Sequence, residues 1–450
     1  MSEHLRIRED SLEPQVGKKA KDIAERPQLV TKAFRLLGCL ALVISCASLS
    51  PTPVSSNESQ TDATHLSACA EITQSGSYVL DRDLLEPQTR NGVCFSIHNT
   101  NDVSFNCDKH TIFIGTVIGF DIRDAKGINL QSCNVTSGPD GNSAIGFSKV
   151  EVGKISSSHI EYQSIHISQS KNIQITDNTF NTSDIVLDKS QNSEISNNEF
   201  TVSKESKRFI RRFLNAFINS MGGSGNKIIN NIMDGQSDGL FKNLLGMDDG
   251  IVLGSESDVS IEENRSLIQN NRISNVFDCG IETVGLVTNS TISHNQVDNA
   301  GVCGIGGWWS NSWQNNIVLE NIANKTPALF SFSYKLRSPF NHPSQVFFTD
   351  NSFTGNRITN QKIDPAEVAY GYQAEPVVID YAAVSYYPTD PNSDNYIVLV
   401  RSNNLFAGND LGTFTSPRFN PGGMIVDGGR NICKPGSSVD FPLRCLTSSQ

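Results

Sequence analysis

The chain repeats one short pattern: an apolar residue, two mostly polar residues, an asparagine, a variable residue and a second apolar residue. Clear copies begin at residues 175, 195, 228, 268, 292, 318 and 348, and weaker copies begin at 130, 155 and 400. The closest copies, at 175 and 195, are 20 residues apart. The spacing between copies is therefore 20 residues or more and varies from copy to copy. Such a repeat predicts a coil whose turns stack along one axis, with loops of different length inserted at its corners.

A second short apolar stretch follows most copies of this pattern. Examples are Ser164-Ile-His-Ile167, Asp184-Ile-Val-Leu187 and Gly250-Ile-Val-Leu253. Because side chains alternate along a strand, the two apolar residues should face the interior and the residue between them should face outward. Strands this short are not stable alone. Each should therefore lie about 4.8 Å from its copy in the next turn, where it completes its hydrogen bonds and shares one core.

The asparagine of the repeat has a structural role in this scheme. Asparagine tolerates left-handed backbone angles at a corner, and its amide can bond the amides of the turns above and below. We therefore expect the equivalent asparagines to form one column. The expected members are Asn178, Asn198, Asn231, Asn271, Asn295, Asn321 and Asn351.

Residues 71–360 resemble the right-handed parallel β-helix proteins of the pectate-lyase-like superfamily. The segment Ser75-Gly-Ser-Tyr-Val-Leu80 is similar to the N-terminal cap of that family, and the asparagine pattern is similar to its coil repeat. The resemblance implies an all-β fold, a right-handed parallel β-helix of about ten coils with an inserted short helix and loops. It also implies action on polysaccharide, since the family's enzymes are mostly lyases, glycoside hydrolases, epimerases and esterases.

The motifs of individual enzymes in that superfamily are missing. The chain lacks the Gly-His-Gly and Arg-Ile-Lys of polygalacturonases, and its nearest string is Arg357-Ile-Thr359. It also lacks the Arg-x-x-Pro-x-x-Arg of pectate lyases and the Asp-Pro-His of mannuronan epimerases. The resemblance therefore selects a fold and a substrate class, and no single reaction.

Residues 1–50 have the features of an export leader. Lys32 and Arg35 precede an apolar run, Leu36 to Leu49, that is shorter than the about 20 residues of a relaxed membrane span. Within it, Val43-Ile-Ser-Cys46 resembles the bacterial lipobox, whose cysteine is lipidated and becomes the new N-terminus. The alternatives are an ordinary signal peptide cut near Ala47, or a short signal anchor. We expect a lipid anchor on Cys46 and a place in the cell envelope, on the outer membrane or secreted.

The rest of the chain divides by composition and by the repeat. Residues 51–68 are rich in Ser, Thr and Pro and predict a flexible tether. The β-helix is expected over 69–410, with an excursion at 361–398, and residues 411–450 form a tail or cap. A helical insertion is expected at 203–221.

That insertion places Phe209, Phe213 and Phe217 at helical spacing, with basic residues on the other faces. Such a helix packs its apolar stripe on the wall of the coil, although a basic amphipathic helix can also lie on a membrane.

Charge excludes one class of partner. Lys and Arg total 36 against 47 Asp and Glu, which gives a net charge of −11. Binding to nucleic acid requires a basic face, so we expect no nucleic-acid partner. We expect a monomer that contacts polysaccharide and, through its lipid, a membrane.

The densest group of acidic residues falls on consecutive coils. Asp248 and Asp278 occupy one position of the repeat, Asp249 lies beside them, and Glu282 points outward from its strand. Paired carboxylates are the minimal equipment of a glycosidase, or could bind Ca²⁺ in a lyase. We predict these four residues as catalytic, and no cofactor apart from a possible Ca²⁺. The structural alternative is that Asp before Gly is a common turn residue.

Three tryptophans follow on the next coil. Trp308, Trp309 and Trp313 are candidate platforms for sugar rings, because exposed indole faces stack on them. The alternative is that Trp308 or Trp309 packs against the 361–398 excursion.

The cysteines are read by their place in the repeat. Cys279 and Cys303 hold equivalent places one coil apart, which permits a disulfide or a stacked thiol pair. Cys107 and Cys133 are also expected at equivalent places of neighbouring coils. Cys433 and Cys445 are predicted to form a disulfide near the C-terminus.

These features predict an envelope lipoprotein that binds polysaccharide and cleaves or modifies it by lyase or glycosidase chemistry. The alternative is a non-catalytic β-helix that binds glycan or has a structural role at the surface. A third hypothesis is a surface protein that contacts another protein through the helix predicted at 207–218.

Overall fold

A computed structural model describes residues 62–446, with gaps. The gaps are 86–88, 90–91, 116, 138–142, 204–215, 237–245, 255–260, 334–344, 370–371, 381–397, 421–424 and 439–440. The described residues belong to one compact unit, Gln60–Gln450. Nearly all of its regular structure is β, with a short 3₁₀ helix, η1 (Pro365–Glu367). None of the helices in this described part has the length and apolar character needed to cross a membrane.

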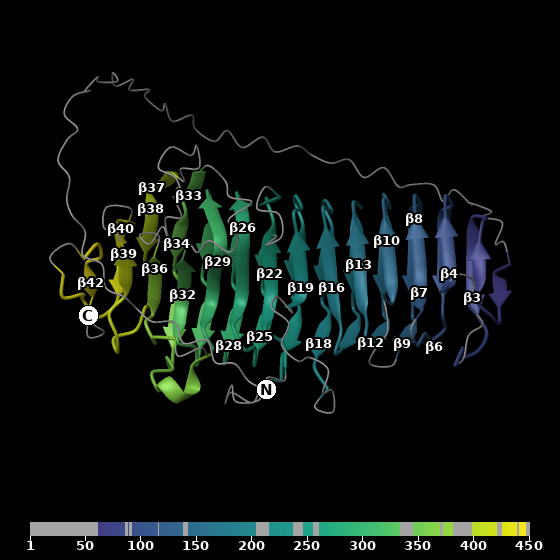
Figure 1. Cartoon of the computed structure of the whole chain (residues 1–450), viewed down its shortest axis with the longest axis horizontal. Helices are drawn as coiled ribbons and strands as arrows, with labels where there is room; N and C mark the ends of the chain where they lie inside the picture. Colours follow the sequence, from purple (N-terminus) through teal and green to yellow (C-terminus); the bar gives the residue numbers. More distant parts are fainter. Residues whose placement is uncertain are drawn as a thin grey trace, which may run out of the picture. The chain divides into compact units, whose positions relative to one another are not determined.

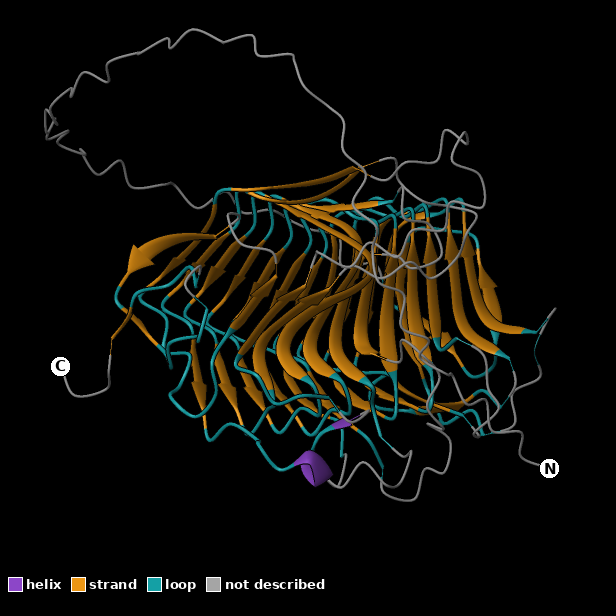
Figure 2. Ribbon diagram, turned by 60° about the vertical axis from the view of Figure 1, so that its left-hand side comes forward, coloured by secondary structure: helices purple, strands orange, loops and turns teal. Residues whose placement is uncertain are grey.

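Three parallel sheets run the length of this unit, and each turn of the chain contributes one short strand to most of them (Figures 1 and 2). Among the described residues, sheet 1 has 14 strands, more than the about ten coils expected. Its strands, in spatial order, are β1 (Thr64–Leu66), β3 (Gly76–Leu80), β5 (Asn101–Asn106), β8 (Lys126–Gln131), β11 (Gly153–Ser156), β14 (Ile173–Thr176), β17 (Glu194–Ser196), β20 (Lys227–Ile229), β24 (Leu267–Gln269), β27 (Thr291–Ser293), β30 (Ile317–Leu319), β34 (Ser352–Thr354), β38 (Asn404–Ala407) and β40 (Ile425–Gly429).

Sheet 2 has 16 strands within the described residues and carries the candidate site. Its main path is β2 (Ala70–Ile72), β4 (Val93–His98), β7 (Ile118–Arg123), β10 (Ile145–Ser148), β13 (Ser164–Ser168), β16 (Asp184–Asp188), β19 (Ala216–Met221), β22 (Asp249–Gly254), β26 (Cys279–Thr288), β29 (Cys303–Gln314), β32 (Ala328–Ser333), β36 (Val377–Asp380) and β39 (Arg418–Asn420). Off this path lie β23 (Glu262–Asn264), β33 (Gln345–Thr349) and β37 (Val398–Ser402).

In the part of the chain that the structure describes, sheet 3 has ten strands, and a separate pair closes the C-terminal end. The strands of sheet 3 are β6 (Thr111–Phe113), β9 (Asn134–Thr136), β12 (His159–Glu161), β15 (Thr179–Asn181), β18 (Glu199–Thr201), β21 (Ile232–Asp234), β25 (Arg272–Ser274), β28 (Gln296–Asp298), β31 (Ile322–Asn324) and β35 (Arg357–Thr359). The separate pair is β41 (Asn431–Ile432) and β42 (Cys445–Leu446). This arrangement is a parallel β-helix: three sheets wound from one chain around a single core.

The core is built from identical positions of neighbouring turns. In β16, Ile185 and Leu187 are buried while Val186 between them is half-buried on the outer face. Ile185 lies in register with Ile165 on one side, and the Phe180 and Phe200 rings stack with centroids 4.5 Å apart. Each turn therefore completes the apolar contacts of the next, which explains why strands of three to six residues are stable here.

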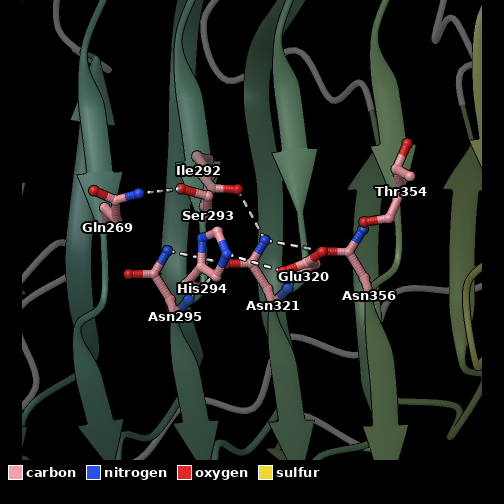
Figure 3. Close-up of polar contacts among 9 residues, drawn as sticks. All are labelled: Gln269, Ile292, Ser293, His294, Asn295, Glu320, Asn321, Thr354 and Asn356. Carbon is pink, nitrogen blue, oxygen red and sulfur yellow. Dashed lines mark hydrogen bonds and ion pairs between the residues drawn. The ribbon is translucent and has the colours of Figure 1, made fainter.

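A column of buried asparagines joins sheet 1 to sheet 3 along the stack (Figure 3). Asn295 donates from Nδ2 to Asn321 Oδ1 at 3.0 Å and to the Ile268 carbonyl at 2.9 Å. Asn321 repeats both contacts, to Asn356 Oδ1 and to the Ile292 carbonyl, each at 2.9 Å. The members of the column are Asn178, Asn198, Asn231, Asn271, Asn295, Asn321, Asn356, Asn409 and Asn431.

The expected column is confirmed for its first six members and wrong for Asn351. Asn351 belongs to a second column at another corner, where it bonds Asn316 at 3.1 Å and Asn404 at 2.9 Å. The copy of the pattern that begins at Phe348 therefore lies one strand before the segment that is equivalent to the other copies. Val318 pairs with Phe353, so the true equivalent runs from Phe353 through Asn356.

The expectation that the column asparagines adopt left-handed backbone angles is wrong. The residues with left-handed backbone angles are those just before the column, such as Asn197 (φ 56°), Asn270 (φ 57°) and His294 (φ 57°). The column asparagines are absent from the described residues with positive φ. Their amides are selected by hydrogen bonding alone, because each satisfies a buried backbone carbonyl and a buried backbone N–H.

The predicted helical insertion at 203–221 is wrong for its final part. Residues 216–221 form β19, which pairs with β16 and β22. Phe217, expected on the apolar stripe of a helix, is fully buried, and its ring centroid lies 5.5 Å from that of Phe200. A core strand satisfies its backbone through neighbouring turns, so tertiary contacts override the helical spacing. Residues 204–215, with the other two phenylalanines, lie outside the described residues.

The stack extends past the expected limits at both ends. β1 begins at Thr64, within the stretch assigned to the tether, and pairs with β3. β39 and β40 lie beyond residue 410 and extend sheets 2 and 1. Within the expected excursion at 361–398, β36 pairs with β32 and so belongs to the coil.

Candidate functional site

Outward residues of sheet 2 form a row, because the same strand position recurs in every turn. We name this the outward row; each member lies in register with the next. Its members are Asp121, Gly146, His166, Val186, Asn219, Val252, Glu282, Gly306 and Ser331.

The four predicted carboxylates come together at the Glu282 end of this row. Asp249 begins β22 and Glu282 lies in β26, the next strand of sheet 2. The Asp278 backbone N–H donates to the Asp248 carbonyl at 2.7 Å, so these two residues are also neighbours on adjacent turns. The charges of Glu282, Asp248 and Asp278 all act on Asp249. The structure thus assembles, from two turns, residues that are up to 34 positions apart (282 − 248).

Asp249 and Glu282 form a buried carboxyl pair. Their exposed fractions are 0% and 4%. Asp249 Oδ1 accepts the Cys279 backbone N–H at 3.0 Å, and the Asp249 carboxyl is a hydrogen-bonding neighbour of the Glu282 carboxyl. Two ionised carboxylates only accept hydrogen bonds, so such a contact requires a proton on one of them.

Burial is the main cause of the altered acidity of this pair. Burial, followed by the charge of Glu282, raises the pKa of Asp249 well above its usual range. Burial raises the pKa of Glu282 to about 7, opposed by its hydrogen bond with Asp249 and reinforced by the charge of Asp248. Strongly interacting carboxyls titrate as a unit, so the pair keeps a shared proton at neutral pH.

The carboxylates do not line an open groove. Asp248 is 5% exposed, and only Asp278 among the four is half-buried. In the described part of the chain, no three or more His, Cys, Asp or Glu side chains converge as a metal site would require.

Beside the pair, a disulfide joins the turn of β26 to the next turn, that of β29. Cys279 and Cys303 are bonded at 2.05 Å, with Cα atoms 4.6 Å apart, and Cys433 is bonded to Cys445. The predicted Cys433–Cys445 disulfide is confirmed, and of the two alternatives for Cys279 and Cys303 the disulfide is the one found. Cys107 is bonded to Cys133.

The bond between Cys69 and Cys94 was missed. The signal for it was available, because 69 to 94 is also one turn of the repeat.

The tryptophans occupy different environments. Trp313, a predicted sugar platform, is fully buried in the core, where its Nε1–H donates to Thr283 Oγ1 at 2.8 Å. That prediction is wrong, because the ring is packed 4.4 Å from Phe332, centroid to centroid. Trp308 is half-buried on the outer side of sheet 2, and only the backbone of Trp309, in β29, is described.

A tyrosine of the 361–398 segment completes the surroundings of the site. The Tyr372 ring packs edge-to-face against Trp308 with centroids 6.1 Å apart, which confirms the packing alternative for Trp308. Its hydroxyl is hydrogen-bonded to Ser331, two turns from Glu282 in the outward row. Burial raises the pKa of Tyr372, so the phenol stays protonated. Sequence reasoning did not place Tyr372 here, because no repeat links that segment to a turn.

The predicted lipidation residue cannot be placed. Cys46 and the whole of the leader at 1–50 lie outside the described residues.

Comparison with known proteins gives structural similarity only. No protein-family model matches the sequence, and a search of curated proteins finds no match. Among solved structures, the catalytic domain of a GH87 α-1,3-glucanase in complex with nigerose is 14% identical, with a TM-score of 0.44 over 76% of this chain and 62% of that one. The chain therefore spans less than two-thirds of that domain.

Two further structures are similar at the same level. PfbA, a surface protein and adhesin of Streptococcus pneumoniae, is 16% identical, with a TM-score of 0.44 over 83% of this chain and 87% of that one. The A-module of the mannuronan C-5 epimerase AlgE6 of Azotobacter vinelandii is 12% identical, with a TM-score of 0.43 over 82% and 92%. Similarity at these low sequence identities bears on the fold alone. Its own three parallel sheets, wound turn upon turn, make this chain a parallel β-helix protein.

Proposed function

We propose that this protein acts on a polysaccharide and cleaves it by acid–base chemistry at the Asp249–Glu282 pair. The observation that carries this proposal is a buried pair of neighbouring carboxyls on the outer face of a sheet, where burial raises the pKa of Glu282 to about 7. A general acid works best when its pKa lies near the working pH. Two carboxyls of unequal protonation can give a proton to a glycosidic oxygen and accept one from water or from a sugar carbon.

The surroundings of the pair support a sugar-directed role. Trp308 and the Tyr372 ring lie on the same outer face, and Asp278 is the half-buried carboxyl nearest the surface. The Cys279–Cys303 disulfide and the N–H bond to Asp249 fix the geometry of the pair. The similar structures reported above include two enzymes and an adhesin, so the choice of catalysis rests on these residues.

The test compares the wild type with Glu282→Gln on a panel of neutral and uronic-acid polymers. Cleavage is read as reducing ends and, for elimination, as absorbance of the unsaturated product. We expect the substitution to lower activity about 100-fold or more, which is the usual worth of an acid–base group. The matched control is Glu199→Gln, since Glu199 is an exposed carboxylate on β18 in sheet 3, and it should retain full activity.

Two results contradict catalysis. If Glu282→Gln is as active as the wild type, the pair is structural. If the wild type cleaves nothing in the panel but binds one of its polymers, the protein is the non-catalytic glycan-binding β-helix of the alternative hypothesis.

The place of action is part of the same proposal. The lipobox-like segment ending at Cys46 favours a lipid-anchored protein of the cell envelope, and the four disulfides of the described residues suit an oxidising compartment outside the cytoplasm. The net charge of −11 disfavours nucleic acid as a partner.

A further inference from the structure

A second polar cluster lies on sheet 2, far from the carboxyl pair. Asp121 in β7 accepts a hydrogen bond from Arg123 Nε at 2.8 Å through Oδ1. Its Oδ2 lies 3.1 Å from Nε2 of His98, which stands in register with Arg123 on the neighbouring strand β4. One carboxylate thus holds two nitrogen-bearing side chains side by side on adjacent turns.

Burial differs sharply within this cluster. The Asp121 side chain is 10% exposed, whereas those of His98 and Arg123 are 39% and 54% exposed. The hydrogen bond with Asp121 raises the pKa of the Arg123 guanidinium, which therefore stays charged. Arg123 bonds Asp121 through Nε, and its side chain is half exposed, so its two terminal nitrogens can act as a pair of oriented donors toward a ligand.

The surface beside the cluster is open and rich in hydroxyl groups. Gly146 follows Asp121 in the outward row, and a Cβ at that position would meet no atom closer than 3.9 Å. His166, the next member of the row, is exposed. Ser148 and Ser168 continue the neighbouring row that begins with His98 and Arg123. Polar side chains therefore lie beside a position that carries no side chain.

The cluster and the carboxyl pair belong to one row. From Asp121 the outward row passes through five intervening strands to Glu282 in β26. Six steps of about 4.8 Å make a separation of about 29 Å. A sugar unit spans about one such step, so a chain of about six units has the length needed to reach from one site to the other.

We propose that His98, Asp121 and Arg123 form an anchoring subsite for the carboxylate of an acidic polysaccharide, and that Asp121 acts by positioning the other two. This inference rests on the proposed polysaccharide function, and it adds the substrate class. The planar end of Arg123 matches a carboxylate through two parallel N–H donors, and Ser148, in register with Arg123, lies beside it for a bond to the sugar carrying that carboxylate.

The test measures binding by calorimetry, using a hexamer of galacturonic acid and, as the neutral counterpart, maltohexaose. We expect the wild type to bind the acidic hexamer and Arg123→Gln to bind it about 10- to 100-fold more weakly, the range for a charged hydrogen-bonded contact. Arg123→Lys should recover part of the affinity, because it keeps the charge and loses the paired donors. The matched control Arg272→Gln removes an exposed arginine from β25 in sheet 3 and should bind as the wild type does.

Each contrary result overturns the subsite. These are a wild type that binds no acidic hexamer, an Arg123→Gln variant that binds it unchanged, and an equally tight affinity for inorganic sulfate, which would mark a site for free anions. Far-UV circular dichroism verifies that the variants are folded. Glu282→Gln should retain hexamer binding and lose cleavage, so the subsite and the catalytic proposal can fail separately.

Discussion

The asparagine column gives the most direct test of what stabilises this fold. Replacing Asn271 with Ala removes four side-chain hydrogen bonds. Its Oδ1 accepts from the N–H and Nδ2 of Asn231, both at 3.0 Å, and its Nδ2 donates to the Ile228 carbonyl at 2.8 Å and to Asn295 Oδ1 at 3.0 Å. Asn295 Oδ1 keeps a bond from the backbone N–H of residue 271, also at 3.0 Å.

Three buried groups therefore lose a partner: two donors on Asn231 and the Ile228 carbonyl. A buried polar group without its partner costs about 1–3 kcal/mol, so we expect Asn271→Ala to lower the free energy of unfolding by about 3–5 kcal/mol. The assay is equilibrium unfolding in guanidinium chloride under non-reducing conditions, followed by circular dichroism.

Two further variants separate the hydrogen bonds from the loss of side-chain volume. Asn271→Ser keeps one acceptor for the preceding turn, as Ser158 Oγ does for the Cys133 N–H at 3.0 Å, and should recover about 1 kcal/mol. Gln174→Ala removes an exposed amide from β14 and should change stability by less than about 0.5 kcal/mol. If Asn271→Ala costs no more than Gln174→Ala, the column does not stabilise the coil and the reasoning is refuted.

The remaining predictions concern pH, the disulfide and the leader. Because the pKa of Glu282 is raised from 4.5 to about 7 in the folded state, its stabilising contribution is complete below about pH 4.5 and is lost as the pH rises through 7; the shift corresponds to about 3 kcal/mol, and Glu282→Gln should flatten the stability difference between pH 5 and pH 8. An unchanged pH slope in that variant would contradict the assigned acidity. The double variant Cys279→Ser and Cys303→Ser should lower the unfolding free energy by about 3 kcal/mol, measured against the wild type with and without reductant, because a loop of 24 residues is no longer closed in the unfolded chain. Cys46→Ser should move the protein from the membrane fraction to the soluble fraction on cell fractionation; equal membrane retention would exclude lipid attachment at this residue.

Much of the fold could be predicted from local sequence, because a solenoid repeats local rules. Each turn needs two inward apolar residues, a corner and an amide that satisfies the corner, and these recur at Ile175, Asn178 and Phe180 in one copy. The place of Cys279 and Cys303 in the repeat also indicated a possible disulfide, since equivalent places in adjacent turns lie within bonding distance. The grouping of the four carboxylates was also predictable, because it needs only the repeat and the alternation of strand side chains.

The tertiary structure decided what the repeat leaves ambiguous. Two asparagine positions five residues apart, Asn351 and Asn356, fit nearly the same pattern, and only strand pairing assigns them to different corners. Phe217 reads as part of a helix until its neighbours in the stack supply backbone partners. Trp313 is buried because β29 lengthens at an irregularity and returns that side chain to the core beside Val287.

The chemistry of the site was likewise decided by three-dimensional packing. Sequence places Asp249 and Glu282 on successive turns, but their shared proton depends on burial and on a contact between two carboxyls that no spacing rule measures. Local sequence therefore determined the coil, because each turn needs only its own residues and its copies. Strand register, side-chain burial and the protonation of the carboxyl pair depend on residues that are distant in the chain. Only the stacking of the turns determines these three properties.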